Sequence, residues 1–588
     1  MKKVLQQLGQ YRKDTFQCIF LTALEVVMEI LLPFVTAIII DQGLEAGNLP
    51  VVYRYGILMV AMAFLSLIFG ALAGRKAARA SSGLAANLRE AIYANVQTFS
   101  FSNIDKFSVP GLVTRMTTDI TNVQNAYMMV IRVAVRAPLN LIFSYIMCLF
   151  INVRLSLMFL IAVVFLLAVL GTIMVVTLKI FNQVFRRYDD LNASVQENVT
   201  AIRVVKAFVR EDYENQKFSK ASRMLYNLSV KAEGLLAFNN PAMMIAVYFC
   251  IISVSWFGAQ FIVGGSLTTG ELTSLFSYIM SLLMSLMMLS MIVVMISMSM
   301  ASIRRISEVL NETPDLTDPE QPVTEVADGS IDFNHVNFSY KQGSGKNALS
   351  DIDLHIKRGE TIGVIGGTGC GKSSLVNLIC RLYDVDQGSV CVGGVDVRKY
   401  DTEALRNQVS VVLQKNTLFS GTILDNLRWG NPDATEEECA RACRAACADE
   451  FIDRMPEGYK TRIERGGSNV SGGQKQRLCI ARALLKKPKV LILDDSTSAV
   501  DTATDAKIRQ AFAKKIPGTT KLIVAQRISS VQDADRILVL DNGRINGFDT
   551  HENLLKTNKI YQEIYEAQTQ GGGDFDQPVP AEKEGAQR

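Results

Sequence analysis

A glycine-rich run between an apolar segment and a helical pattern carries the clearest chemistry in this 588-residue chain. Residues 366–373 read Gly-Gly-Thr-Gly-Cys-Gly-Lys-Ser and follow the apolar run Thr361–Ile365. Glycines let backbone N–H groups close around phosphates at a helix N-terminus, the lysine reaches the β- and γ-phosphates, and the serine binds Mg²⁺. The sequence therefore predicts a nucleotide site. The residues expected to line it are Gly366, Thr368, Gly369, Cys370, Gly371, Lys372, Ser373 and Ser374.

A second apolar run ends in two adjacent acids, Asp494 and Asp495. In hydrolases that share this loop, the first acid helps to hold Mg²⁺ and the second polarises the attacking water. Aspartate is one methylene shorter than glutamate, so the carboxylate of Asp495 lies roughly 1.5 Å further back. We expect it to be too far from that water for a direct hydrogen bond. We expect this site to bind nucleotide better than it hydrolyses it.

The cysteines leave two questions open. Cys370 is beside Lys372 at a helix N-terminus, where a thiol can have a lowered pKa and react with alkylating agents. We favour the alternative, a small residue at a tolerant loop position. Three further cysteines repeat at helical spacing, which favours a packed helix face over a metal site. They are Cys439, Cys443 and Cys447.

Two kinds of domain must position these residues. Beyond residue 328, short β-rich runs alternate with helical patterns, which predicts an α/β P-loop domain over 329–569. The first half instead contains six apolar stretches long enough to cross a bilayer, which predicts a transmembrane helical domain over 1–305. A proline-containing linker is expected at 306–328, and the polar tail 570–588 is expected to be disordered. The six stretches lie near 16–40, 55–75, 130–151, 155–178, 241–263 and 272–300.

The distribution of Lys and Arg predicts how the chain crosses the bilayer. These residues crowd the N-terminus and two long loops, about 76–129 and 179–240, and are absent from the short connections 41–53 and 264–271. We therefore expect a multi-pass protein of the cytoplasmic membrane, with both termini and the nucleotide domain in the cytoplasm. The two long loops have helical periodicity and are expected to be long helices. The net charge of +4 is spread over the chain and gives no footprint for nucleic acid.

A third motif, residues 471–474, opens a helical run. With the phosphate-binding loop, the acidic strand end and six spans, it resembles the signature of ABC transporters, and residues from about 10 to 568 resemble an exporter half-transporter. The resemblance implies ATP and Mg²⁺ as cofactors. It also implies that Tyr340 stacks on adenine, that Gln414 senses Mg²⁺ together with Ser373 and Asp494, and that Asp501 belongs to the D-loop. The signature residues are Ser471, Gly472, Gly473 and Gln474.

The chain departs from that family at two positions. Asp495 stands where the family has a catalytic glutamate, and Gln526 stands where it has a switch histidine. Gln526 can hydrogen-bond a phosphate but carries no ionisable proton. In the family, two nucleotide domains sandwich two ATP molecules, and the signature of one chain faces the loop of the other. A weak site with an intact signature therefore resembles the degenerate half of bacterial heterodimeric multidrug exporters.

That resemblance predicts a second half-transporter chain as partner, with glutamate and histidine intact. It also predicts a hydrophobic or amphipathic substrate, such as a drug, lipid or peptide. Two alternatives stay open. One is an ATP-gated or regulatory membrane protein that binds nucleotide without pumping, and the other is a slow homodimeric exporter that uses Asp495 itself.

In the transport half, Glu25 and Glu29 are one turn apart in the first span, and Arg132 and Arg136 are likewise paired entering the third. Ionisable residues at membrane depth face the protein interior or a water-filled cavity. The acids indicate a cavity for cationic amphiphiles. We favour the alternative, in which these residues form an internal ion-pair set or the arginines simply extend to the cytoplasmic boundary of the bilayer. Met284 and Met288 belong to a methionine stripe in the sixth span, which fits a promiscuous apolar surface and ordinary packing equally well.

Two segments near the tips of the long loops, 101–107 and 207–213, resemble the coupling helices of the exporter family. Such helices dock on nucleotide domains. Their aromatic residues Phe107, Phe208 and Tyr213 are expected to anchor a small interface.

Overall fold

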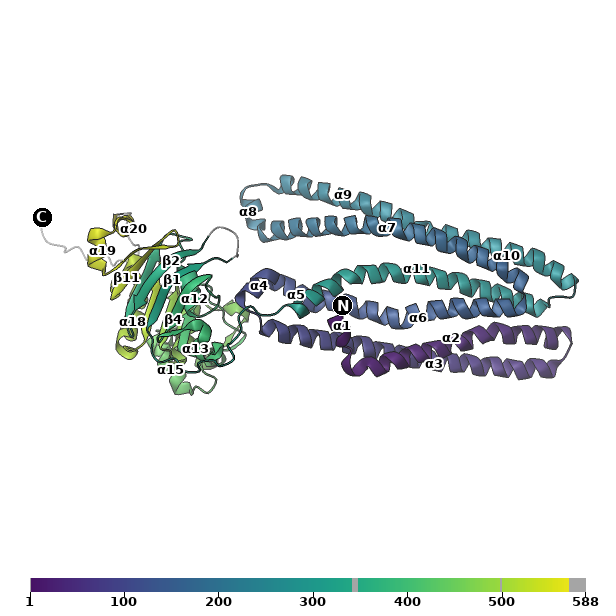
Figure 1. Cartoon of the computed structure of the whole chain (residues 1–588), viewed down its shortest axis with the longest axis horizontal. Helices are drawn as coiled ribbons and strands as arrows, with labels where there is room; N and C mark the ends of the chain where they lie inside the picture. Colours follow the sequence, from purple (N-terminus) through teal and green to yellow (C-terminus); the bar gives the residue numbers. More distant parts are fainter. Residues whose placement is uncertain (1, 341–346, 497–499, 571–588) are drawn as a thin grey trace, which may run out of the picture. The chain divides into compact units, whose positions relative to one another are not determined.

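A computed structural model of the chain describes residues 2–340, 347–496 and 500–570 (Figure 1). The expected disordered tail lies outside these residues, except for residue 570. The chain forms two compact units. The first comprises residues 1–98 and 107–313, and the second comprises residues 99–106 and 314–588.

The first unit consists of long helices (Figure 1). Six of its helical segments are long and apolar enough to cross a membrane, in agreement with the six expected spans. The two long loops are helical as predicted, because α3 continues to Gln97 and α7 to Thr200. The main helices are α2 (Arg12–Ile38), α3 (Leu49–Gln97), α6 (Ile120–Ile151), α7 (Val153–Thr200), α9 (Glu211–Ala237), α10 (Asn239–Val263) and α11 (Thr269–Asn311). Shorter ones are α1 (Lys2–Gln6), α5 (Val109–Thr114) and α8 (Ile202–Ala207).

A proline inside α2 shows how such helices stay hydrogen-bonded in a medium without water. Pro33 has no N–H, so the carbonyl oxygen of Glu29, four residues earlier, loses its usual partner within the helix. Hydroxyl groups of helix α11 bond to two other carbonyl oxygens next to this break. Tyr278 donates to the carbonyl oxygen of Ile30 over 2.8 Å, and Ser274 donates to that of Pro33 over 2.6 Å. The first and last spans are joined at this point.

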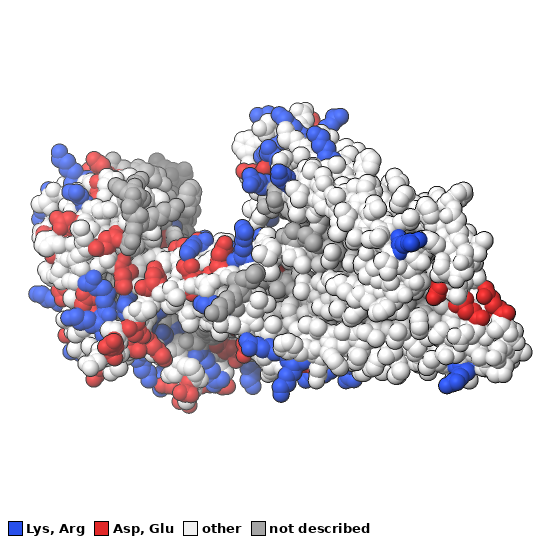
Figure 2. Space-filling model, turned by 45° about the vertical axis from the view of Figure 1, so that its right-hand side comes forward, with Lys and Arg blue, Asp and Glu red and all other residues white. Residues whose placement is uncertain are grey.

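The surface of the spanning helices is broadly uncharged, as Figure 2 shows. Many large apolar side chains are exposed there, among them Phe64 and Phe150. The second unit instead carries acidic and basic side chains interspersed (Figure 2). This contrast is expected if lipid surrounds one unit and water the other.

The second unit contains two main sheets. A mixed sheet has the strand order β12-β11-β3-β10-β9-β6, and an antiparallel sheet has the order β2-β1-β4-β5. Every residue of β9 and β10 is buried, as expected for strands covered on both faces. The mixed sheet comprises β3 (Thr361–Gly366), β6 (Val409–Val412), β9 (Val490–Asp494), β10 (Thr520–Val524), β11 (Arg536–Asp541) and β12 (Arg544–Asp549). The other comprises β1 (Ile331–Phe338), β2 (Leu349–Ile356), β4 (Gln387–Val392) and β5 (Val395–Asp396), and a two-stranded ribbon pairs β7 (Gly421–Thr422) with β8 (Arg462–Ile463).

Three parallel strands define the edge where the site must form. Val524 at the end of β10 lies opposite Asp494 of β9 on one side and Val364 of β3 on the other. Ligands bind at the carboxyl ends of parallel strands in open α/β sheets, because the loops that leave those ends converge. The loop after β3, the acids after β9 and the segment after β10 are therefore brought together.

The helices of the second unit cover these sheets and form a smaller helical part (Figure 1). In that part Cys439 and Cys443 are fully buried in the apolar core. No group of three His, Cys, Asp or Glu residues in the described ranges is arranged to hold a metal ion. The packed-face interpretation is confirmed for these two cysteines. The helices are α4 (Phe101–Phe107, the last residue in the first unit), α12 (Lys372–Ile379), α13 (Thr402–Gln408), α14 (Ile423–Arg428), α15 (Glu436–Ala445), α16 (Asp449–Ile452), α17 (Gly472–Leu485), α18 (Thr502–Lys515), α19 (His551–Thr557) and α20 (Lys559–Gln570).

Candidate nucleotide site

A cavity of about 330 Å³ lies at the carboxyl edge of the mixed sheet. It brings together most of the residues that the sequence assigned to nucleotide, metal and water. Its lining includes Tyr340, Thr368, Gly369, Gly371, Lys372, Ser373, Ser374, Gln414, Asp494, Asp495 and Gln526.

The glycine-rich loop between β3 and α12 has a backbone that side chains would obstruct. Gly371 has φ +103°, and a Cβ there would lie 2.8 Å from the carbonyl oxygen of Ala348. A Cβ on Gly366 would lie 2.2 Å from the carbonyl oxygen of Leu540. Lys372 curls back over this loop and donates from Nζ to the carbonyl oxygens of Gly366 and Gly367, each over 2.8 Å. The loop thus presents backbone N–H groups and one ammonium at the start of α12.

Cys370 is packed inside the loop. Its side chain is 5 % exposed and belongs to the apolar core of the sheet. A Cβ on Gly366 would lie 2.7 Å from its sulfur, so the thiol fills the space that Gly366 leaves. This burial favours the small packed residue over the reactive thiol.

Ser373 and Asp494 form the oxygen pair of the site. The hydroxyl of Ser373 donates to Oδ1 of Asp494 over 3.2 Å. Burial raises the pKa of Asp494, and the neighbouring Asp495 raises it further, whereas Ser373 and Lys372 oppose that shift. A cation between these oxygens would relieve that cost, and carboxylate and hydroxyl oxygens are ligands that Mg²⁺ accepts.

Asp495 is held by two amide side chains. Gln526 donates from Nε2 to Oδ2 of Asp495 over 2.9 Å, and Gln414 donates to the same oxygen over 3.3 Å. The backbone of Asp495 has φ +47°, a left-handed conformation that aspartate tolerates better than most residues. The carboxylate is therefore held by groups that donate protons in hydrogen bonds but take up none.

Tyr340 lies at the mouth of the loop and links it to other aromatic rings. Its hydroxyl is 3.0 Å from that of Ser374, and its ring packs edge-on against Phe338 and Tyr383 with centroids 4.9 and 5.1 Å away. Half of its surface is exposed. An exposed ring face beside the phosphate-binding loop is what stacking on a base requires.

The signature motif and Asp501 do not line this cavity. Ser471 caps α17: its hydroxyl accepts from the backbone N–H of Gln474 over 3.3 Å, and the Gln474 side chain accepts from the N–H of Ser471 over 2.9 Å. Asp501 caps α18 by accepting from the backbone N–H of Thr504 over 2.9 Å, and hydrogen bonds from Thr504 lower the pKa of Asp501. Ser498 and Ala499, expected beside Asp501 in the D-loop, lie outside the described residues. Gly472 and Gly473 form the first turn of α17, ahead of a rigid helix.

The sequence missed a set of contacts between helix α4 and the rest of the second unit. Tyr383 donates its hydroxyl to Oδ2 of Asp105 over 2.8 Å, and its ring lies 6.2 Å from that of Phe101. Burial and the bond to Asp105 raise the pKa of Tyr383 well above its usual value. Because Tyr383 also packs on Tyr340, two aromatic contacts connect α4 with the mouth of the nucleotide loop.

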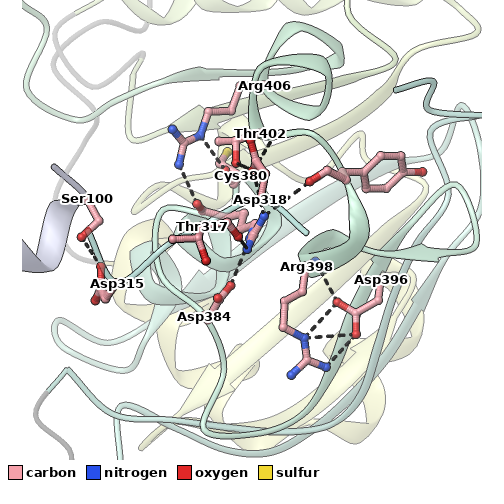
Figure 3. Close-up of polar contacts among 12 residues, drawn as sticks. Ser100, Asp315, Thr317, Asp318, Cys380, Asp384, Asp396, Arg398, Thr402 and Arg406 are labelled. Carbon is pink, nitrogen blue, oxygen red and sulfur yellow. Dashed lines mark hydrogen bonds and ion pairs between the residues drawn. The ribbon is translucent and has the colours of Figure 1, made fainter. Parts of the chain in front are cut away.

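A second set of contacts fixes the segment that enters the nucleotide domain (Figure 3). Ser100, just before α4, and Ser102 within it both donate to Asp315, and these bonds lower the pKa of Asp315 against the opposing effect of burial. Close by, the buried Arg381 donates to the carbonyl oxygen of Thr317 over 2.9 Å and pairs with Asp384 over 3.3 Å.

The first residues of the linker expected at 306–328 are helical, since α11 continues to Asn311.

The aromatic residues expected to couple the domains occupy different environments. Phe107 is 9 % exposed and lies beneath the guanidinium of Arg115, 4.7 Å from its ring centroid. Phe208 and Tyr213 are 73 % and 59 % exposed on the first unit. Their expected docking remains a prediction.

The acidic pair of the first span is joined to one arginine. Arg136 donates to Oε1 of Glu25 over 2.9 Å and to both oxygens of Glu29 over 2.6 and 2.7 Å. Arg132 lies near Gly74, where a Cβ would be 3.5 Å from its guanidinium. The internal ion-pair set is therefore the interpretation that the contacts support. Met284 and Met288 are 51 % and 44 % exposed in the single chain, which leaves both of their interpretations open.

Comparison with known protein families gives two matches along the chain. Residues 15–306 match the ABC transporter transmembrane region, and residues 349–498 match the ABC transporter family model.

Three individual proteins are similar over most of their length. The uncharacterised ABC transporter ATP-binding protein YfiB of Bacillus subtilis (strain 168) is 35 % identical over 97 % of this chain and 98 % of its own. The ATP-dependent lipid A-core flippase of Desulfotalea psychrophila is 33 % identical over 83 % of this chain and 85 % of its own. The solved structure of a bacterial Atm1-family ABC exporter with ATP bound superposes with a TM-score of 0.82 at 25 % identity, covering 95 % of this chain and 99 % of that one.

Proposed function

The chain belongs to the ABC transporter family, as an exporter half-transporter whose ATPase domain drives transport, and we propose that it is the degenerate-site subunit of a heterodimer. In that role it retains one slowly hydrolysed ATP and lends its signature to the active site of a partner chain. The observation that carries this proposal is the pair of amides on Asp495. Gln526 and Gln414 both donate to its Oδ2, so two side-chain amides compete with water for the carboxylate that a general base would use.

The residues of the cavity fit ATP and Mg²⁺. Tyr340 would stack on the base, the loop amides and Lys372 would hold the phosphates, and Ser373, Asp494 and Gln414 would hold the metal ion. When bound, Mg²⁺ supplies positive charge that stabilises the developing charge on the phosphates. The chain's own residues orient the nucleotide and close the loop over it. Asp495 is one methylene shorter than glutamate, and Gln526 has no ionisable proton. Both differences slow the activation of water and therefore ATP hydrolysis.

The intact signature gives the chain a second task. Ser471 and Asp501 lie at the beginnings of two helices, where backbone N–H groups and the helix dipole favour a phosphate. They are outside this chain's cavity, so a partner's nucleotide is the one that they would contact. We infer that the partner carries glutamate and histidine at the positions of Asp495 and Gln526.

The transported substrate is proposed to be hydrophobic or amphipathic. The spanning helices expose apolar and methionine side chains, and the similarity to a lipid A-core flippase is consistent with an amphipathic cargo. Because Glu25 and Glu29 share the single cation Arg136, half of their negative charge is balanced by that residue. The distribution of Lys and Arg supports placement in the cytoplasmic membrane, with both termini in the cytoplasm.

Co-purification with the product of a neighbouring gene, followed by ATPase assays, tests the proposal. Replacing the partner's glutamate should remove nearly all turnover, whereas Asp495→Asn should change it by less than about twofold. ATP hydrolysis at about 10 per second or more by this chain alone would contradict the division of labour.

A further inference from the structure

The switch segment after β10 is held by a side chain from the last helix of the domain. Gln568 of α20 donates from Nε2 to the carbonyl oxygen of Gln526 over 2.8 Å. Its Oε1 accepts from the backbone N–H of Ile528 over 2.9 Å. Both atoms of one primary amide are therefore used on the two residues that flank Arg527.

The chemistry of this contact resembles strand pairing. Ladder pairing of β10 ends at Val524, so the backbone groups that follow need other partners. A carbonyl and an N–H two residues apart present the same pattern that a neighbouring strand would meet. A glutamine amide supplies one donor and one acceptor at that spacing, which neither a carboxylate nor an ammonium can do.

Helix α20, which carries Gln568, is anchored to the domain by buried side chains. Tyr561 is fully buried, and its hydroxyl is 2.7 Å from Nδ1 of His551. Ile564 and Tyr565 pack against the same apolar core that contains Ile528. Residues 561, 564 or 565, and 568 lie on one face of a helix, so the anchoring of the first turns directs Gln568 at the switch segment.

The held segment carries the side chain that contacts Asp495. Gln526 uses its carbonyl for Gln568 and its side-chain amide for Asp495. We propose that Gln568 is a positioning residue that fixes Gln526 against Asp495, so that α20 controls how tightly this site retains nucleotide. This inference rests on the proposed function, in which Gln526 faces bound ATP.

Hydrogen–deuterium exchange of the full-length chain in nanodiscs tests the contact directly. Gln568→Ala should speed exchange of the Ile528 amide roughly fivefold or more, because its acceptor is lost. Gln562→Ala is the matched control, since Gln562 lies on the same helix and donates over 2.6 Å to the carbonyl oxygen of Leu555. Unchanged exchange at Ile528 in Gln568→Ala, or an equal change in both variants, would overturn the inference.

Retention of a fluorescent, non-hydrolysable ATP analogue tests the consequence. We expect Gln568→Ala and Gln526→Ala each to speed release about three- to tenfold, and the double variant to release no faster than Gln526→Ala alone. Gln568→Glu should behave like Gln568→Ala, because it keeps the size and the acceptor but loses the donor. Additive effects, rescue by glutamate, or equal release from all variants would each refute a role through Gln526.

This readout does not require hydrolysis. If the chain alone proves to be a fast ATPase, the proposed function fails while the coupling between Gln568 and Gln526 is still measured. If the site is slow but release is additive, the proposed function stands and the positioning role fails.

Discussion

Gln526 donates a hydrogen bond to Oδ2 of Asp495 across 2.9 Å, and the two residues belong to loops that leave neighbouring strands. In the degenerate site that we propose, each stands where the exporter family has a residue used for hydrolysis. Their contact means that these two departures from the family pattern are physically joined, since the side-chain amide of Gln526 holds the carboxylate of Asp495. The following predictions start from this pair.

Restoring both family residues should reactivate the site. Asp495→Glu with Gln526→His in this chain is expected to raise the rate of ATP hydrolysis at its own site about 100-fold or more, because general-base catalysis contributes roughly 10²- to 10⁴-fold. Each single change should raise the rate of hydrolysis less than about threefold. With Asp495→Glu alone, Gln526 still occupies the carboxylate, and with Gln526→His alone, the acid is still too short. Single-turnover assays in the heterodimer, with the partner's own glutamate replaced, isolate this site. A fully active single variant would contradict the argument.

Removing the metal ligands should weaken nucleotide binding. Ser373→Ala and Asp494→Asn are each expected to lower the affinity for Mg-ATP about tenfold or more, because both oxygens face the same point in the cavity. Chelation of Mg²⁺ should weaken binding to the wild type and have little further effect on the variants. Ser468→Ala is the control, because it removes a hydroxyl from an exposed serine outside this cavity. The affinities are measured by titration with a fluorescent nucleotide. If chelation of Mg²⁺ weakened nucleotide binding equally in the wild type and in every variant, Ser373 and Asp494 would not be the metal ligands.

Deleting the Tyr383 hydroxyl should loosen α4 from the nucleotide domain. Tyr383→Phe keeps the aromatic contacts and loses the hydrogen bond to Asp105, and a hydrogen bond to a charged group contributes about 1.5–3 kcal/mol. Transport per ATP hydrolysed should fall while ATP binding is kept. Tyr226→Phe, which removes a hydroxyl from a side chain that is 65 % exposed, should have no effect. A proportional loss of binding and transport would indicate general damage instead.

Breaking the ion-pair set in the membrane should cost stability. Arg136→Met leaves two carboxylates without their cation, and removing one partner from a buried pair costs about 3–5 kcal/mol. The thermal unfolding midpoint in detergent should drop by several degrees, whereas Arg154→Met in an exposed position should not change it. Combining Arg136→Met with Glu25→Gln and Glu29→Gln should restore much of the loss. If the double glutamine variant transports every tested cation like the wild type, a cationic cavity at these acids is excluded.

The nucleotide site is predictable from contiguous motifs in the sequence. The loop from Gly366 to Ser373 and the acids after β9 are each continuous runs, and parallel strands bring such segments to one edge. The contacts of Tyr383, Asp105 and Gln568 are not predictable in the same way. Each depends on a side chain that meets a segment far away in the chain, and neither a tyrosine nor a glutamine in a helical pattern is a motif. Phe107 was predicted as a coupling residue from its position near a loop tip, and Phe101 on the same helix is the ring that reaches Tyr383.

The backbone N–H of Asp495 donates to the carbonyl oxygen of Val524 over 3.0 Å, which extends the pairing of β9 and β10 into the loops. This one bond has an evolutionary consequence. Loops tied at their base move together, so a reversion in one loop meets an unreverted neighbour at close range. In the heterodimer that we propose, recovering only one of the two family residues would therefore restore little hydrolysis. A single-step return to a self-sufficient site would be disfavoured, and the dependence on a partner chain would be hard to undo.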